Sequence, residues 1–190
     1  FDANIVSNTY TNGKGIITFD GEISTIGDYA FRWCDITSVT IPNSVTSIGK
    51  NPFQNCRNLK QFNGELASHD GRCLIVSGVL NSFAPAGLTE YNIGNSVTAI
   101  GDDAFANCDS LVEVHISDFA IWLNNCDGYY DNPIWATENT KLYINGEELA
   151  ASGELIIPNG VTSVGAYAFA NNDTITRVIF PDGIANIGTG

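Results

Sequence analysis

Two histidines and five cysteines are the residues of this sequence that could do acid–base, nucleophilic or metal chemistry. His69 stands beside Asp70, but the sequence places no nucleophile or third partner with this pair, and His115 is far from it along the chain. No two cysteines have the C-x-x-C spacing of a zinc site, and no nucleophile elbow or phosphate-binding loop occurs. We therefore predict no catalytic residue, no metal site and no cofactor.

Three of the cysteines occupy equivalent places in a repeated pattern. Cys34, Cys56 and Cys108 each follow a phenylalanine by three residues, and Asn172 takes the same place near the end of the chain. The total of five cysteines is odd, which does not suit a complete disulfide framework. We expect small buried residues that stack from one repeat to the next, with disulfide or redox roles as the alternative.

The pattern that places these cysteines is Ile-Gly or Val-Gly with a phenylalanine four residues after the glycine. The successive glycines of the pattern are 22, 52, 64 and 23 residues apart, so two intervals are single repeats and two carry extra material. Aliphatic residues at fixed offsets with a period of 20 to 29 residues are typical of a leucine-rich-repeat-type solenoid. The copies are Ile26-Gly27 with Phe31, Ile48-Gly49 with Phe53, Ile100-Gly101 with Phe105, Val164-Gly165 with Phe169, and the shortened Ile187-Gly188.

Each repeat begins with a short alternating strand. In residues 38–41 the apolar Val39 and Ile41 face one side, and Ser38 and Thr40 face the other. Stacked coils would pair such strands in parallel. Pro42 follows the strand, where a missing backbone donor costs little. The later glycine permits a tight corner that a Cβ would crowd.

Three stretches carry a family resemblance: SVTIPNSVTSIG over residues 38–49, AIGDDAFANCDSL over 99–111 and IIPNGVTSVGAYAFANN over 156–172. The sequence resembles the BspA-like leucine-rich repeat proteins of bacterial cell surfaces, over roughly residues 16–188. The resemblance implies a right-handed leucine-rich-repeat superhelix and a parallel strand ladder. It also implies a secreted or surface location, with a host protein or another cell as the class of ligand.

The predicted fold is a repeat solenoid, mainly β with short helical turns, that forms one domain over residues 1–190. We expect an irregular start over 1–15, about eight coils, and expansions near 65–88 and 118–150. The abrupt start and end inside the pattern favour a fragment of a longer protein. The expansions predict two inserted β-hairpins, at 72–84 and 142–149, the second with Asn145-Gly146 as its turn, and a short helix capped by Asp118.

The outward side of the predicted ladder is one candidate binding surface. Its side chains are polar and mildly acidic, without an aromatic stripe, so solvated ladder positions are the alternative interpretation. The binding candidates on this surface are Thr40, Asn63, Glu90, Asn92, Glu113 and His115.

An aromatic loop in the second expansion is the other candidate. Tyr129, Tyr130 and Trp135 flank a turn around Pro133, and exposed aromatic rings on a rigid scaffold stack on sugars or anchor a protein partner. The alternative is that Trp122 and Trp135 fill the core where the repeat is interrupted, with the tyrosines covering them.

Charge excludes some partners. The formal net charge is −13, from 21 acidic and 8 basic residues, which argues against phosphate backbones and anionic membranes. We expect no nucleic-acid partner, no membrane insertion in this segment, an extracellular location and a monomer. The sequence leaves three hypotheses: a module for protein binding or adhesion, a carbohydrate-binding module, and a passive spacer. No enzymatic activity is expected.

Overall fold

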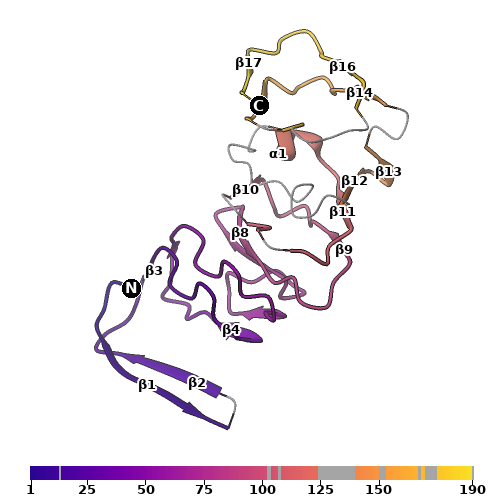
Figure 1. Cartoon of the computed structure of the whole chain (residues 1–190). Helices are drawn as coiled ribbons and strands as arrows, with labels where there is room; N and C mark the ends of the chain where they lie inside the picture. Colours follow the sequence, from indigo (N-terminus) through magenta and orange to yellow (C-terminus); the bar gives the residue numbers. More distant parts are fainter. Residues whose placement is uncertain are drawn as a thin grey trace.

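The computed structural model describes residues 1–12, 14–101, 104–106, 108–123, 140–149, 153–166, 168–169 and 175–189. Its coils stack into an elongated, bent solenoid with the two chain ends at opposite ends of the stack (Figure 1). The stack has about six turns, fewer than the eight expected. The number is smaller because parts of both expansions replace segments of a coil instead of adding coils.

A first ladder of parallel strands runs along one side of the stack, as predicted. Ser38 pairs with Gln61 and Thr40 with Asn63, so equivalent positions of successive coils lie side by side. The ladder consists of three separate sheets: β4 (Ser38–Thr40) with β6 (Gln61–Asn63); β9 (Glu90–Asn92), β11 (Glu113–Ile116) and β12 (Lys141–Ile144), extended by β13 (Glu147–Glu148); and β14 (Glu154–Ile156) with β16 (Arg177–Ile179).

A second ladder of two-residue strands follows the turn after each first strand. The N–H of the repeat glycine donates to the coil before it, from Gly49 to Ile26 O at 2.8 Å and from Gly188 to Val164 O at 2.7 Å. A Cβ at Gly49 would lie 2.6 Å from the backbone nitrogen of Asp28, which explains the glycine at this corner. The strand pairs are β3 (Thr25–Ile26) with β5 (Ser47–Ile48), β8 (Val79–Phe83) with β10 (Ala99–Ile100), and β15 (Ser163–Val164) with β17 (Asn186–Ile187).

The first expansion forms the predicted hairpin, from β7 (Cys73–Val76) and β8. Its turn places Ser77 and Gly78 at positive φ. The second strand of the hairpin also pairs in parallel with β10, and the Gly101 N–H donates to Leu80 O at 2.8 Å. The hairpin therefore takes the place of one second-ladder strand.

The second expansion contains the predicted helix and hairpin. The helix α1 (Phe119–Leu123) is capped by Asp118, whose Oδ1 accepts from the Ala120 N–H at 2.8 Å, and it buries Phe119, Trp122 and Leu123. The Gly165 N–H donates to Leu123 O at 2.6 Å, so α1 replaces another second-ladder strand. The hairpin β12–β13 turns at Asn145 and Gly146, which have φ of 51° and 87° and fit the predicted turn.

The expectation of an irregular start was wrong. Residues 5–19 form an antiparallel hairpin of β1 (Ile5–Thr11) and β2 (Lys14–Phe19) that projects from the end of the stack (Figure 1). It is joined to the first coil by Asp2, whose carboxylate accepts from the backbone N–H groups of Ser24 and Thr25. The strand β1 was missed because its residues are mostly exposed, so its sequence lacks the alternation of apolar and polar residues that predicts a half-buried strand.

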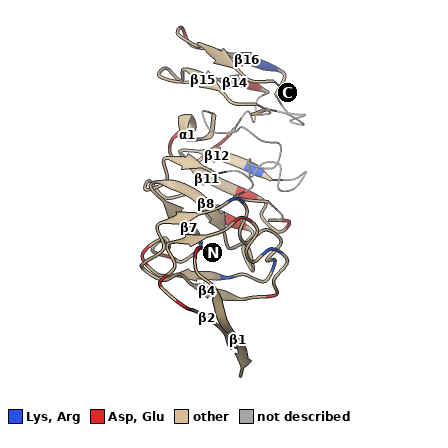
Figure 2. Cartoon of the chain, turned by 90° about the vertical axis from the view of Figure 1, so that its left-hand side faces the viewer, with Lys and Arg blue, Asp and Glu red and all other residues tan. Residues whose placement is uncertain are grey.

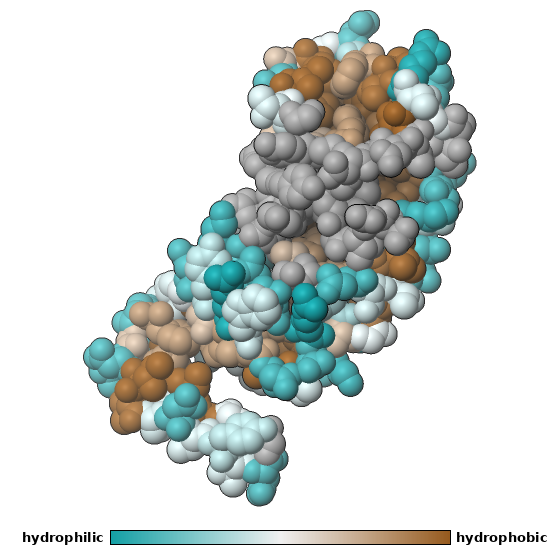
Figure 3. Space-filling view, in the orientation of Figure 1, coloured by the Kyte–Doolittle hydropathy of each residue, from teal (hydrophilic) through white to brown (hydrophobic). Residues whose placement is uncertain are grey.

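The hydrophobic core runs through the stack as two clusters that meet at the first hairpin. In β7, Cys73 packs in the C-terminal cluster and Leu74 in the N-terminal one, so this strand is buried on both faces. Cys56 and Cys108 are buried at equivalent places, as predicted, and Cys34 is half-buried; Cys126 lies outside the described residues. The last two coils expose Ile156, Phe180 and Ile187, and hydrophobic side chains are visible at that end in Figure 3.

Candidate binding face and notch

Four of the predicted binding residues lie together on the outward side of β9 and β11. Glu90 is directly opposite Glu113, and Asn92 is directly opposite His115. Alternation puts these four side chains on the solvent side, while Tyr91 and Val114 between them are buried. The next strand adds Lys141 opposite Glu113 and Tyr143 opposite His115. We call the outward side of β9, β11 and β12, with these six residues, the acidic face.

His115 lies at the centre of the acidic face. Its Nε2 is 3.6 Å from a carboxylate oxygen of Glu113 and 3.7 Å from one of Glu90. Its ring stacks on that of Tyr143, with centroids 4.6 Å apart and an angle of 16° between the planes. The side chain is 23% exposed, so the imidazole is held in a fixed position between two carboxylates and an aromatic ring.

Lys141 is engaged at the outer edge of the acidic face. Its Nζ donates to Glu148 Oε2 at 2.9 Å, across from β12 to β13. The hydrogen bond to Glu148, together with the negative charge of that residue, raises the pKa of Lys141. Few other Lys or Arg residues occur along the described part of the stack (Figure 2). The acidic face therefore keeps an excess of negative charge.

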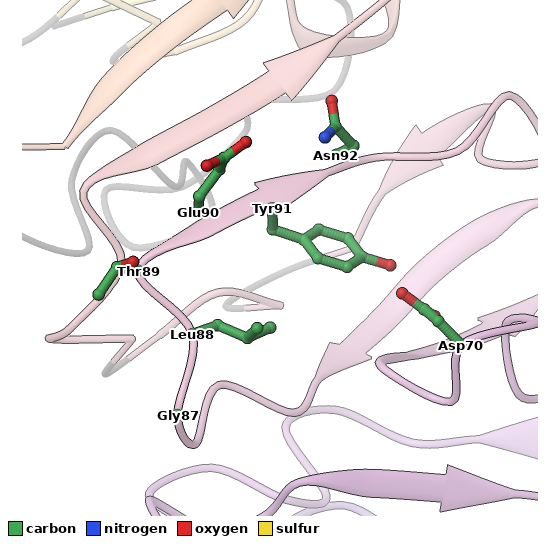
Figure 4. A pocket seen from close by; sticks show the side chains of 7 residues that line it. All are labelled: Asp70, Gly87, Leu88, Thr89, Glu90, Tyr91 and Asn92. Carbon is green, nitrogen blue, oxygen red and sulfur yellow. The ribbon is translucent and has the colours of Figure 1, made fainter.

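A notch borders the acidic face where the first ladder is interrupted. It is open to solvent, and its volume is about 360 Å³. Tyr91 enters it from β9, with its hydroxyl directed at Asp70 from the loop before β7 (Figure 4). The residues that line it are Asp70, Gly87, Leu88, Thr89, Glu90, Tyr91 and Asn92.

Asp70 is fixed by hydrogen bonds on the wall of the notch. Its Oδ1 accepts from Ser68 Oγ at 2.5 Å and from the Arg72 N–H at 3.0 Å. Partial burial raises the pKa of Asp70, but these hydrogen bonds, with one from Tyr91, outweigh it and leave the pKa below its usual range. The guanidinium of Arg72 turns away and donates to the carbonyls of Ala84 and Ala86. Asp70 thus remains a carboxylate without a cation of its own.

The buried thiols of the described residues are not activated as nucleophiles. Cys73 Sγ lies 3.2 Å from the hydroxyl of Tyr91. Burial raises the pKa of Cys73 to about 12 and that of Cys56 to about 11, and it raises the pKa of Tyr91 as well. Thiols with raised pKa are poor nucleophiles and poor metal ligands at neutral pH. Among the described residues, no group of three or more metal-ligating side chains comes together.

Two of the remaining predicted residues lie on another sheet. Thr40 and Asn63 pair with each other on the separate sheet of β4 and β6, and Asn63 donates to Val39 O at 3.3 Å. Tyr129, Tyr130 and Trp135 lie outside the described residues. Sequence reasoning missed Lys141 and Tyr143, although their spacing of two within the predicted hairpin could have placed them on one face.

The comparisons with known proteins identify the family. The family model described as a BspA type leucine rich repeat region matches six copies, over residues 5–69, 80–126 and 149–190. The chain belongs to the BspA-type leucine-rich repeat family. No curated protein matches its sequence. Within the described residues, no helix is long and apolar enough to cross a bilayer.

Two solved structures are similar to this BspA-type chain. One is a leucine rich cell surface protein of Faecalibacterium prausnitzii A2-165, with 20% identity over 83% of this chain and 51% of that one, and a TM-score of 0.46. The other is a leucine-rich repeat protein of Bacteroides ovatus ATCC 8483, with 21% identity over 88% and 49% and a TM-score of 0.32. This chain spans about half the length of each.

Proposed function

We propose that this chain is a protein-binding module of a secreted or surface-anchored bacterial protein, and that it contacts its partner through the acidic face. The observation that carries the proposal is the pairing of Glu90 directly opposite Glu113. Like charges at directly opposed positions of a sheet destabilise it. A fold that keeps such a pair on an exposed, otherwise well-paired sheet is consistent with selection for a contact with a basic or polar surface.

The other features of the acidic face support the same proposal. Its three strands belong to a four-stranded hydrogen-bonded sheet, so its side chains are held on rigid elements. Tyr143 and His115 add a stacked aromatic pair to the charged groups. Aromatic side chains are enriched at protein–protein contacts. We propose binding rather than catalysis, because neither the face nor the notch joins a nucleophile to a base.

Charge reversal tests the proposal. The double variant Glu90→Lys/Glu113→Lys and a control with the same charge change far from the face, Glu22→Lys/Asp182→Lys, would be compared by biolayer interferometry. The analytes would be purified extracellular-matrix proteins, serum proteins and whole bacterial cells. We expect a ligand of the wild-type protein to lose about tenfold or more in affinity with the first variant and little with the control. Equal binding by both variants would remove the acidic face from the proposal.

A carbohydrate-binding function is a second candidate, favoured by an exposed aromatic pair. Trp33 and Tyr29 are 66% and 44% exposed, and Arg32 lies between their rings. Both have positive φ, at positions where the next coil has Asn55 and Asn51. Large side chains in this backbone region are unusual and are often functional. A glycan array on which the wild-type protein binds no sugar would exclude this function. Sugar binding that Trp33→Ala, Tyr129→Ala and Trp135→Ala all leave unchanged would exclude these aromatic residues as its site.

A further inference from the structure

The strand β9 ends its sheet at the notch. It pairs with β11 on one side, and the strand before it in the ladder, β6, belongs to a different sheet. The free side of β6 is already occupied, because the Phe62 N–H donates to Gly71 O at 2.7 Å. The ladder is therefore open between Asn63 and Glu90.

The open side of β9 presents backbone groups to the notch. Thr89 O accepts from the Glu113 N–H at 3.1 Å, and the Ile93 N–H donates to His115 O at 2.9 Å, so these residues direct their backbone towards β11. In a parallel ladder the backbone direction alternates along a strand. The N–H and C=O groups of Glu90 and Asn92 consequently point the other way, into the notch. An unpaired strand edge of this kind is a template for another strand.

The notch has room for an added segment. All three residues of β9 line it. On the opposite wall stands the Asp70 loop, and Gly87 at the base has open space where a Cβ would be (Figure 4). An extended peptide needs little more than the width of one strand, because its side chains alternate above and below the sheet.

Charge selects the kind of segment. The carboxylate of Asp70 stands on one side of the notch and that of Glu90 on the other, with Glu113 next to Glu90. No lysine or arginine is among the residues that line it. Two cations of the neighbouring elements are engaged elsewhere: Arg72, two residues after Asp70, binds backbone carbonyls, and Lys141, in the same sheet as β9, binds Glu148.

We propose that the notch receives an extended segment of a protein partner, which adds a strand to the free edge of β9 and places a lysine or arginine side chain between Asp70 and Glu90. This inference rests on the proposed protein-binding function and specifies how the partner is held. Backbone hydrogen bonds to Glu90 and Asn92 would provide the pairing, and the carboxylates would select basic residues, as in other cases of strand addition.

Three short peptides test strand pairing and charge separately. The ¹⁵N-labelled protein would be titrated with acetyl-Thr-Lys-Val-Arg-Val-amide, with the same peptide N-methylated at alternate residues, and with a version in which glutamate replaces lysine and arginine. We expect saturable shifts of the Glu90 and Asn92 amides with the first peptide. The other two should bind at least about tenfold more weakly, because one lacks the backbone donors and the other is repelled.

A pair of matched variants tests the contribution of the carboxylates. Glu90→Gln should weaken binding of the basic peptide by up to about fivefold at low salt, as expected for a partly exposed ion pair. Glu22→Gln removes the same charge at an exposed position just before β3, in the first coil, and should leave the affinity unchanged. Both sites are exposed, so both variants should fold, and their amide spectra verify this.

Several results would overturn the inference. Equal binding of the N-methylated peptide would exclude strand pairing, and equal effects of the two glutamine variants would exclude charge selection. Shifts at Asp70 and Glu90 with calcium alone, and none with the basic peptide, would indicate an ion site. If no peptide shifts Asn92 while Glu90→Lys/Glu113→Lys still abolishes partner binding, strand addition fails and the proposed function stands.

Discussion

The first ladder is interrupted at two places, which differ in whether the exposed strand edge is left open or is paired with another strand. At the first break the inserted hairpin joins the second ladder, through β8 and β10, and the edge of β9 stays open. At the second break the hairpin folds back within the first ladder, so that β13 covers the edge of β12. An insertion in a solenoid thus opens or closes the ladder depending on which ladder its strands join.

The cavities at the two breaks also differ in the chemistry of the residues that line them. The notch at the first break is bordered by carboxylates and by backbone groups of β9. The cavity at the second break has a similar volume, about 380 Å³, but apolar side chains form most of its wall. Its apolar lining consists of Phe119, Ala120, Ile144, Leu149, Leu155, Ile156, Pro158 and Val161. Polar contacts are therefore expected at the first break and apolar contacts at the second.

The largest expected effect is the loss of a fully buried core side chain in the second expansion. Trp122 is 0% exposed and lies on the helix that replaces a second-ladder strand. Trp122→Ala should lower the free energy of unfolding by about 3–5 kcal/mol, because the lost contacts leave a cavity. Leu80→Ala, the matched change in β8 at the first break, should cost about 2–5 kcal/mol. Urea unfolding followed by circular dichroism measures both.

The control for these core changes is Trp33→Ala. Trp33 is exposed, so its removal should change the free energy of unfolding by less than about 0.5 kcal/mol. If Trp122→Ala were no more harmful than this control, α1 would not be part of the packed core.

A second prediction compares a regular coil with the hairpin coil. A Cβ at Gly49 would lie 2.6 Å from Asp28 N and 2.8 Å from Gly27 C. Both are backbone atoms, so relieving this clash would distort the neighbouring coil. At Gly101, which faces the hairpin, the nearest atom is Leu80 O at 3.2 Å. Gly49→Ala should therefore destabilise by about 1–3 kcal/mol. Gly101→Ala should stay within about 1 kcal/mol of the wild type.

The midpoint temperatures of thermal unfolding of Gly49→Ala and Gly101→Ala test this prediction. Equal destabilisation would mean that the hairpin coil is stacked as tightly as a regular coil. A stabilised Gly101→Ala variant would fit the comparison, because alanine restricts the unfolded chain and the hairpin leaves nearly enough space for the methyl group.

Local patterns in the sequence predicted most of the fold. The Ile-Gly and Phe offsets predicted the coils, Asn145-Gly146 predicted the second hairpin, and Asp118 predicted the helix start. Each depends on residues within a few positions of one another. The hairpin of β1 and β2 and the smaller number of turns could not be obtained in this way. They depend on pairing between strands and on which segment of a coil an insertion replaces.

The same distinction applies to the candidate site. Alternation along each strand placed Glu90 and Asn92 on the face shared with Glu113 and His115, as predicted. Thr40 and Asn63 were grouped with them because the repeat suggests one continuous ladder. The break between β6 and β9 separates them, and it arises from hydrogen bonds between residues such as Phe62 and Gly71 that no periodicity specifies.

A third prediction concerns acid and the first break. Although partial burial raises the pKa of Asp70, its hydrogen bonds with Ser68, Arg72 and Tyr91 hold it below the usual range. A lowered pKa means that the carboxylate stabilises the fold above about pH 4, and that this contribution is lost as pH falls through the folded-state value. Asp70→Asn should thus unfold at lower urea than the wild type at pH 7, with a smaller difference at pH 3. Asp182→Asn is the exposed control, and a difference that did not depend on pH would contradict the role of the charged form.

The smallest expected effect lies at the second break and has the opposite pH dependence. The hydrogen bond to Glu148 and the charge of that residue raise the pKa of Lys141, so this contact stabilises the β12–β13 pair below the usual lysine pKa of about 10.4. The contribution is lost as pH rises through the folded-state value. Glu148→Gln should unfold at slightly lower temperature than the wild type at pH 8 in low salt.

The difference at Glu148 should vanish in high salt or at strongly alkaline pH, because the pair is exposed and screened. Amide exchange of Ile144 and Leu149 near pH 7 gives a local measure, since Ile144 pairs with Glu147 of β13 and the Leu149 N–H donates to Leu142 O at 2.7 Å. Faster exchange in Glu148→Gln, with Glu90 and Asn92 unchanged, would show that the ion pair closes the second edge without affecting the first. Parallel changes at β9 would mean that the two breaks are coupled through β11, and that the open and closed edges do not behave as separate sites.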